Sequence, residues 1–195
     1  MIKRIVSAIL ILTFCIGCGV NVFAAQTVPG EEINIEVTHS VAPIPYVDIY
    51  MSANRFKSYM SYKAITKNDS PQHLLQEMCY TDADGFRRCA DRYVIAVGRG
   101  VGGQVGDCID LILTNGQVIY CVIGDYKANK YTDAANLTGK NGCCSEFIVD
   151  SAVLRRDIKY RGTVGCGYIG WDSPVLLIRR YAMNYLVLDL GGSKE

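Results

Sequence analysis

The chain is organised around residues 92–150, which begin RYVIAVGRGVGGQVGDCIDLILTNGQVIYCVIGDYKA (residues 92–128). Three apolar runs in this stretch alternate with polar residues or are rich in β-branched residues, a composition that is typical of strands. These runs cover residues 93–97, 109–114 and 117–123. The pair Asn115-Gly116 predicts a hairpin with a type I′ turn, because both central residues of that turn need a positive φ. The stretch therefore predicts a sheet with polar residues at its strand ends.

Three aspartates, Asp125, Asp133 and Asp150, lie at strand ends or in the loop between strands. Glycosidic-bond cleavage needs a carboxyl group that exchanges a proton with the bridging oxygen, with its pKa raised by burial or by a second carboxylate. Because the three lie in one strand–loop–strand passage, we expect them to share a cleft as catalytic residues. The alternative is structural, since an aspartate at a turn often accepts hydrogen bonds from its own backbone. Glu146, in the same passage, is expected to be a solvated strand residue.

Polar and aromatic residues near these aspartates are the candidate substrate-binding groups. Lys127 follows Asp125 by two residues, so in a strand both side chains point the same way. Lys127 would keep the carboxyl ionised or steady a ligand, and the alternative is an ordinary surface ion pair. Tyr126 and Tyr131 would stack on sugar rings or serve packing, and Arg99 would reach an anionic group on a glycan stem peptide. The predicted binding set is Lys127, Tyr126, Tyr131, Asn136 and Arg99.

Residues 1–24 have the layout of a secretory signal peptide. Lys3 and Arg4 are followed by an apolar run over residues 5–18 and by small residues before a cleavage position after Ala24. We expect a secreted or cell-wall-associated protein with no membrane contact after cleavage. The alternative is a membrane anchor that stays uncleaved, because the apolar run comes close to the length that spans a bilayer.

The segments before the central stretch predict less regular structure. Residues 25–50 contain three prolines and predict an extended lead-in. Residues 51–90 predict two short helices, the first on an apolar stripe over residues 56–64. The second helix would have Ser70 as its N-cap and Pro71 at its first position, where the missing N–H costs nothing.

Residues 91–192 predict the main domain, in which residues 175–181 and 185–190 add two strands to those of the central stretch. About six strands hide their edges best by closing on themselves. The predicted fold class is therefore mainly β, a small six-stranded barrel preceded by two short helices.

Seven of the nine cysteines follow residue 24, and export would put them where disulfides persist. Cys79 and Cys89 flank the polar turn at residues 81–85, which makes them the best predicted disulfide pair. The odd number leaves at least one thiol over. No Cys-x-x-Cys follows residue 24, so a zinc ribbon is unsupported and we expect no metal or other cofactor. A net charge of +1 without a basic cluster argues against a nucleic-acid partner.

Three segments carry a resemblance to a known class: GDYKA (residues 124–128), TDAAN (132–136) and EFIVD (146–150). They resemble exported proteins of Gram-positive bacteria that are similar to the double-psi β-barrel class. This class includes three-aspartate cell-wall domains, rare lipoprotein A-like proteins and membrane-bound lytic transglycosylases. The resemblance covers about a third of the chain. It implies a six-stranded double-psi barrel, peptidoglycan as substrate and an aspartate as acid/base.

The expected function is therefore that of an exported cell-wall protein acting on peptidoglycan glycan strands in the manner of a lytic transglycosylase. The alternative is a barrel module of the same fold that binds glycan or a protein without catalysis. The discriminating feature is whether a partly buried carboxyl lies near other polar groups in an open cleft.

Overall fold

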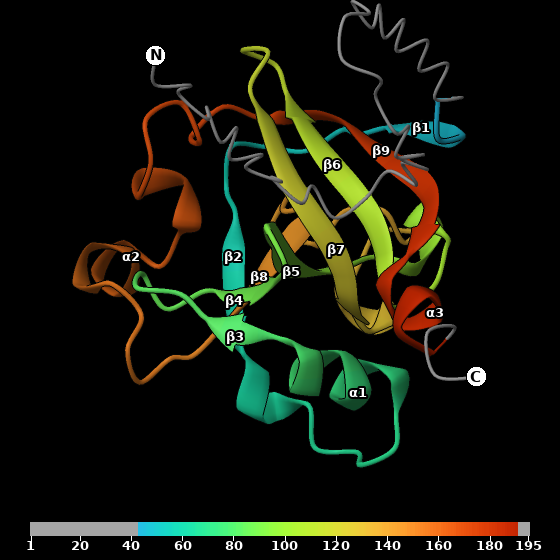
Figure 1. Cartoon of the computed structure of the whole chain (residues 1–195). Helices are drawn as coiled ribbons and strands as arrows, with labels where there is room; N and C mark the ends of the chain where they lie inside the picture. The colour runs from blue at the N-terminus through green and yellow to red at the C-terminus, as the bar shows by residue number, and fades with distance from the viewer. Residues whose placement is uncertain (1–42, 191–195) are drawn as a thin grey trace, which may run out of the picture. The chain divides into compact units, whose positions relative to one another are not determined.

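The computed structural model describes residues 43–190, with side chains as far as Val187, so the predicted signal peptide and most of the lead-in lie outside the described residues. The residues from Ile44 onward belong to one unit (Figure 1). Within residues 43–190 the fold is mainly β, as the sequence predicted, with nine strands and three α-helices. The strands are β1 (Tyr46–Tyr50), β2 (Ser58–Ser61), β3 (Tyr80–Thr81), β4 (Arg87–Cys89), β5 (Arg92–Val97), β6 (Asp107–Leu113), β7 (Val118–Tyr126), β8 (Ser145–Val149) and β9 (Val175–Asn184), and the helices are α1 (Pro71–Met78), α2 (Arg156–Arg161) and α3 (Tyr185–Leu190).

The strands form one mixed sheet in which β5 is the junction. β5 pairs in parallel with β7 and antiparallel with β8 and β4. β6 pairs with β7 on one side and β9 on the other, and β1 lies outside β9. β2 pairs in parallel with β8. Among the described strands, β1, β2 and β3 each have one partner, so the sheet has open edges.

The sequence predicted the β6–β7 hairpin correctly but assigned it the wrong turn type. Gly116 has a φ of +85°, whereas Asn115 is not among the residues with positive φ. The Gly116 N–H donates to the Leu113 carbonyl at 2.9 Å and the Leu113 N–H donates to the Gln117 carbonyl at 2.8 Å. This is a three-residue loop, a type I turn followed by a left-handed glycine. A single residue of the loop therefore needs a positive φ.

We expect Gly116→Val to lower the free energy of unfolding by about 1–3 kcal/mol, the usual cost of a β-branched residue at positive φ. A Cβ at this position would meet no atom within 4 Å, so the loss would come from the backbone conformation alone. Gly116→Asn is the matched control and should lose less, because asparagine tolerates the left-handed region. Urea unfolding measures both variants, and an unchanged Gly116→Val protein would contradict this turn assignment.

Two segments at the N-terminal side form strands where the sequence predicted otherwise. Residues 46–50, expected in the lead-in, form β1, which pairs along its whole length with β9. Residues 58–61, expected in the first helix, form β2, in which Ser58 is the partner of Glu146 on β8. Pairing with distant strands overrides the helical spacing of the apolar residues, because propensity and pattern are weak compared with tertiary contacts.

The two helices that border the sheet begin at residues that cap them. α1 starts as predicted, with the Ser70 hydroxyl accepting a hydrogen bond from the His73 N–H at 3.2 Å. Residues 185–190, predicted as a strand, instead form helix α3. The Asn184 side-chain oxygen accepts from the N–H groups of Leu186 at 2.9 Å and Val187 at 3.3 Å. This N-cap stops β9 from continuing in an extended conformation.

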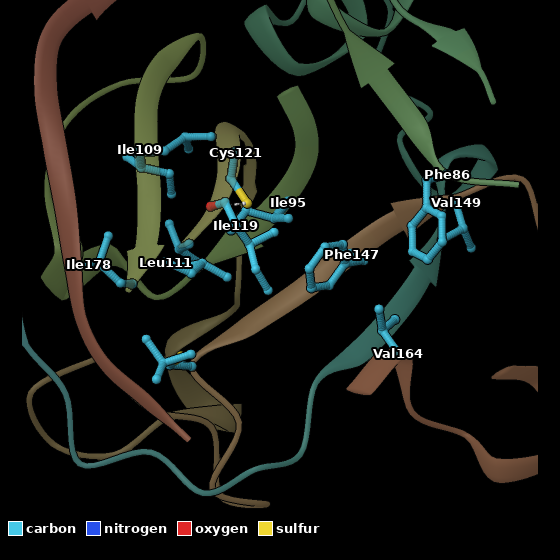
Figure 2. Packing of buried hydrophobic residues seen from close by; sticks show 14 of the residues in the cluster. Phe86, Ile95, Ile109, Leu111, Ile119, Cys121, Phe147, Val149, Val164 and Ile178 are labelled. Carbon is cyan, nitrogen blue, oxygen red and sulfur yellow. Dashed lines mark hydrogen bonds between the residues drawn. The ribbon is translucent and has the colours of Figure 1, made fainter. Parts of the chain in front are cut away.

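Buried side chains form two clusters on the two faces of β5. The larger cluster joins Ile95 on β5 to Phe147 on β8, Ile178 on β9 and residues of β6 and β7 (Figure 2). The smaller one joins Val94 to its neighbours on β7 and β8 and to Leu75 of α1. β5 is therefore buried on both faces, and alternation puts Ala96 on the face that α1 covers.

Lys57, just before β2, is a fully buried charged residue. Its Nζ donates to the carbonyls of Trp171 at 2.6 Å and Ser173 at 2.7 Å, and more weakly to that of Arg55 at 3.4 Å. Three acceptors match the three N–H bonds of an ammonium group. Burial lowers the pKa of this group. Lys57 therefore ties the beginning of β2 to the segment that leads into β9.

The predicted Cys79–Cys89 disulfide is wrong for this structure, because no sulfur atoms are bonded among the described cysteines. The two residues are nevertheless neighbours. A hydrogen bond between their side chains raises the pKa of the Cys79 thiol, and Cys79 Sγ lies 2.9 Å from the Leu75 carbonyl. The two side chains therefore meet as thiols and not as a disulfide.

We expect stability to fall at high pH because buried thiols hold their protons more tightly when folded. Burial raises the pKa of Cys108 from 9.0 to about 11. A raised folded-state pKa gives stability that is complete below pH about 9 and is lost as the pH rises through about 11. The Cys108 contribution should fall by about 1.4 kcal/mol per pH unit in this interval. Urea unfolding across it should show a shallower slope for Cys108→Ala, and equal slopes would contradict this reasoning.

Candidate functional site

Strand pairing aligns four residues across adjacent strands, which we call the polar row: Ser58, Glu146, Ala96 and Asp125. Ser58 is the partner of Glu146, and Ala96 is the partner of Glu146 on one side and of Asp125 on the other. Paired residues point to the same face of a sheet, and strands lie about 4.8 Å apart. The Cα atoms of Asp125 and Glu146 are therefore about 10 Å apart. Only the methyl group of Ala96 separates these two carboxyl residues on that face.

A bulge on β7 puts Asp125 in this row. The pairing of β5 with β7 shifts between Ile95 and Ala96, which leaves Gly124 as an extra residue. A Cβ on Gly124 would lie 2.2 Å from Val94 Cγ1, so only glycine fits there. Bulges re-aim the side chains that follow them and occur often beside functional sites. The Gly-Asp pair at the strand end was the sequence signal for this arrangement.

Asp125 is half-buried and faces helix α1. The Gln72 side-chain amide donates to its Oδ1 at 3.3 Å. The two residues line a hollow of about 210 Å³ together with Ser70 and Lys67. In Figure 1, β7 descends from its turn toward α1 and α3, which matches this contact. Asp125 is thus a partly buried carboxyl beside polar groups in an open hollow, the feature that the sequence analysis required.

Glu146 lines a neighbouring cleft of about 440 Å³, here called the Tyr–Lys cleft. The other side chains that give it its chemistry are Tyr126, Lys127, Tyr131 and Lys140. Glu146 is half-buried, and its Oε1 lies 3.4 Å from the Ser58 hydroxyl, which donates to it. The sequence analysis treated Glu146 as a solvated strand residue and missed this role. Glu146 reaches this position because β8 pairs with β5, which puts it opposite Ala96. The residues next to Glu146 in the sequence do not indicate this pairing.

Three of the five predicted binding residues line this cleft. Lys127 Nζ donates to the Cys143 carbonyl at 3.5 Å, which holds the side chain along the cleft wall. Tyr131 is 61% exposed, so its ring is open to a ligand. The Tyr126 hydroxyl donates to the Gly103 carbonyl at 2.8 Å, and the Arg99 guanidinium lies 4.8 Å from the centre of its ring. Lys127, Tyr131 and Tyr126 therefore lie at one cleft.

Arg99 lies on the far side of Tyr126, where it lines a separate cleft of about 420 Å³ with Gln72 and Asn184. Gln72 also lines the hollow at Asp125, and Tyr126 also lines the Tyr–Lys cleft. Tyr126 thus lines both the cleft of Arg99 and the Tyr–Lys cleft, and Gln72 lines both the cleft of Arg99 and the hollow at Asp125. The three hollows are separate but lie around residues Asp125 to Lys127 at the end of β7.

Asp133 and Asn136 shape their own loop instead of lining a cleft. The Asp133 carboxylate accepts from the N–H groups of Leu137 at 2.9 Å and Thr138 at 3.2 Å. Asn136 has a φ of +55°, and its carbonyl accepts from the Gly100 N–H at 2.9 Å. These contacts match the structural alternative for Asp133. Asn136 holds the loop against the glycine segment that carries Arg99, so it positions that segment.

Asp150 does not join the other aspartates, and the expectation of one cleft shared by all three is corrected here. Glu146 lies opposite Ala96 on β5. Asp150 follows Glu146 by four residues, which puts it about 13 Å further along the direction of β8 and away from the polar row. Its Oδ1 accepts from the Ala152 N–H at 2.9 Å and its carbonyl accepts from the Leu154 N–H at 3.0 Å. Asp150 caps the turn that follows β8, at the end opposite Asp125.

Three further observations concern metal ligands, membrane-spanning helices and similarity to known proteins. Within residues 43–190, no three His, Cys, Asp or Glu side chains come close enough together to hold a metal ion. In the same part of the chain, no helix is long and apolar enough to cross a membrane. A scan of protein-family models and a search of curated proteins found no match to this chain.

Proposed function

We propose that this protein is an exported cell-wall protein that binds peptidoglycan glycan strands in the Tyr–Lys cleft and cleaves them with Asp125 as the acid/base. The observation that carries this proposal is the polar row, in which Asp125 and Glu146 flank Ala96 on one face of the sheet. An exposed tyrosine and two lysines beside the row suit a ligand with sugar faces and carboxylates. Export rests on the pattern of residues 1–24.

The two carboxyl residues would have different roles. Asp125 would protonate the oxygen that leaves the scissile glycosidic bond. Glu146 would take the proton of the hydroxyl group, from water or from the sugar itself, whose oxygen bonds to the anomeric carbon as the glycosidic bond breaks; glycosidases use carboxyl pairs roughly 5–10 Å apart for such steps. Asp125 lines the hollow beside Gln72, whereas Glu146 lines the Tyr–Lys cleft with Lys127. The Asp125 and Glu146 carboxyl groups therefore have different surroundings. A general acid and a general base need such a difference, because they must hold their protons with different strength.

The proposed fold is a six-stranded barrel of the double-psi kind. Six strands follow one another by pairing in the order β9, β6, β7, β5, β8 and β2. Lys57 supports closure, because its Nζ links the beginning of β2 to the segment before β9. β1, β3 and β4 would be additions to this barrel. A run of six paired strands is what the six-stranded barrel of the resembled class would need, and the proposal assigns these six to it.

A second candidate function is glycan binding without cleavage. It is favoured because the Asp133 and Asp150 carboxylates are engaged by backbone N–H groups. That leaves Asp125 as the one predicted catalytic aspartate that lines a hollow.

Co-sedimentation of the mature protein with purified sacculi tests the binding step that both candidates share. We expect the protein in the pellet, and an excess of soluble glycan fragments should release it. A protein that stays in the supernatant would contradict both candidates. Release of soluble glycan fragments from the sacculi separates them, because only cleavage produces such fragments.

A further inference from the structure

A separate cleft of about 530 Å³, here called the arginine cleft, lies between the segment before β2 and the segment that follows α2. Its main side chains are Arg55, Phe56, Arg161, Tyr168 and Asp172. None of these residues lines the Tyr–Lys cleft or the hollow at Asp125. In Figure 1, α2 lies to the left of β2, away from the end of β7. The arginine cleft is therefore a different site.

The walls of the arginine cleft are held in place before any ligand arrives. The Lys57 carbonyl accepts from the Val164 N–H at 2.8 Å, and Lys57 Nζ binds the carbonyls of the opposite wall. The Tyr168 ring lies 4.4 Å from that of Trp171, and its hydroxyl donates to Asp84. Burial raises the pKa of Tyr168, so this hydroxyl remains a neutral donor. Preformed walls reduce the cost of ordering side chains on binding.

The side chains of the two arginines in the cleft have no charged or hydrogen-bonded partner among residues 43–190. Arg55 and Arg161 are exposed, and neither guanidinium has a hydrogen bond or ion pair with residues 43–190. By contrast, Arg155 and Arg179 each pair with an aspartate at 2.6 to 2.8 Å. A guanidinium presents two parallel N–H donors that match the geometry of a carboxylate. Two such groups at one cleft favour an anionic ligand.

We infer that the arginine cleft binds a small ligand with a free carboxylate and an apolar body, such as the C-terminal residues of a peptide. The carboxylate would lie between Arg55 and Arg161, and the apolar body would pack on Phe56 and Tyr168. Asp172, on the cleft rim, would accept an N–H of the ligand. The volume lies within the range of about 300–1,000 Å³ that is usual for small-ligand sites. This inference does not depend on the proposed glycan function.

Calorimetric titration with N-acetyl-Phe-Ala and with its C-terminal amide tests the inference. We expect the acid to bind at least about tenfold more tightly than the amide, because only the acid offers a carboxylate to the arginines. Arg55→Gln and Arg161→Gln should each weaken binding of the acid by about tenfold. Arg156→Gln is the matched control, since Arg156 is an exposed arginine of the same helix that does not line the cleft.

Equal binding of acid and amide would overturn the inference, as would an equal loss in the Arg156→Gln control. Absence of binding up to about 10 mM of the acid would also overturn it. Thermal unfolding of the three variants shows whether they are folded. All three arginines are exposed, so we expect unchanged midpoints.

Discussion

Lys57→Met should lower the free energy of unfolding by about 2–5 kcal/mol, because it leaves two buried carbonyl groups without a hydrogen-bond donor. Methionine has a similar length but no donor, so the carbonyls of Trp171 and Ser173 would lose the groups now at 2.6 and 2.7 Å. A buried acceptor without a partner costs about 1–3 kcal/mol. Since a typical domain is stable by only about 5–15 kcal/mol, this loss would be large. Urea unfolding at neutral pH measures it.

Lys63→Met is the matched control, because Lys63 is an exposed lysine six residues further along the chain. We expect it to change stability by less than about 0.5 kcal/mol. A Lys57→Met protein as stable as this control would show that the link between β2 and β9 is not important for the fold. It would also remove the main support for the proposed closure of the barrel.

Asp125→Asn should reduce the release of glycan fragments from sacculi by about 10²–10⁴-fold, the usual contribution of a general acid. Asparagine can still accept the hydrogen bond from Gln72, now 3.3 Å long, so the hollow should keep its shape. It cannot donate a proton to a leaving oxygen. The rate of fragment release, measured beside the thermal midpoint, separates a chemical loss from a folding loss.

Asp150→Asn is the control for Asp125→Asn. It makes the same chemical change at a carboxylate that follows β8 and lies away from the polar row. We expect it to keep the release activity and to change stability by less than about 0.5 kcal/mol, because asparagine caps a turn about as well as aspartate and still accepts the hydrogen bond from the Ala152 N–H. If Asp150→Asn were folded and as inactive as Asp125→Asn, the assignment of Asp125 as the acid/base would be wrong.

Features that depend on neighbouring residues could be predicted from the sequence. The β6–β7 hairpin follows from Asn115-Gly116 between two apolar runs, and the beginning of α1 follows from Ser70-Pro71. Lys127 and Tyr131 lie at one cleft because the segment after β7 is short. These features depend on residues that are close together in the sequence, so they form in the same way whatever the distant parts of the chain do.

Features that depend on distant pairing could not be predicted. β2 forms because Ser58 and its neighbours pair with β8, whose residues lie far along the chain. The same pairing brings Glu146 into the polar row, and it separates Asp150 from Asp125. The role of Asp133 depended on which N–H groups its loop would offer, and these come from Leu137 and Thr138.

Incubation of the mature protein with purified sacculi, followed by mass spectrometry of the soluble fraction, tests most directly whether the polar row cleaves glycan. We expect the protein to release muropeptides and the Asp125→Asn variant to release almost none. Pellet-bound protein with no released muropeptides would contradict cleavage and leave glycan binding as the function.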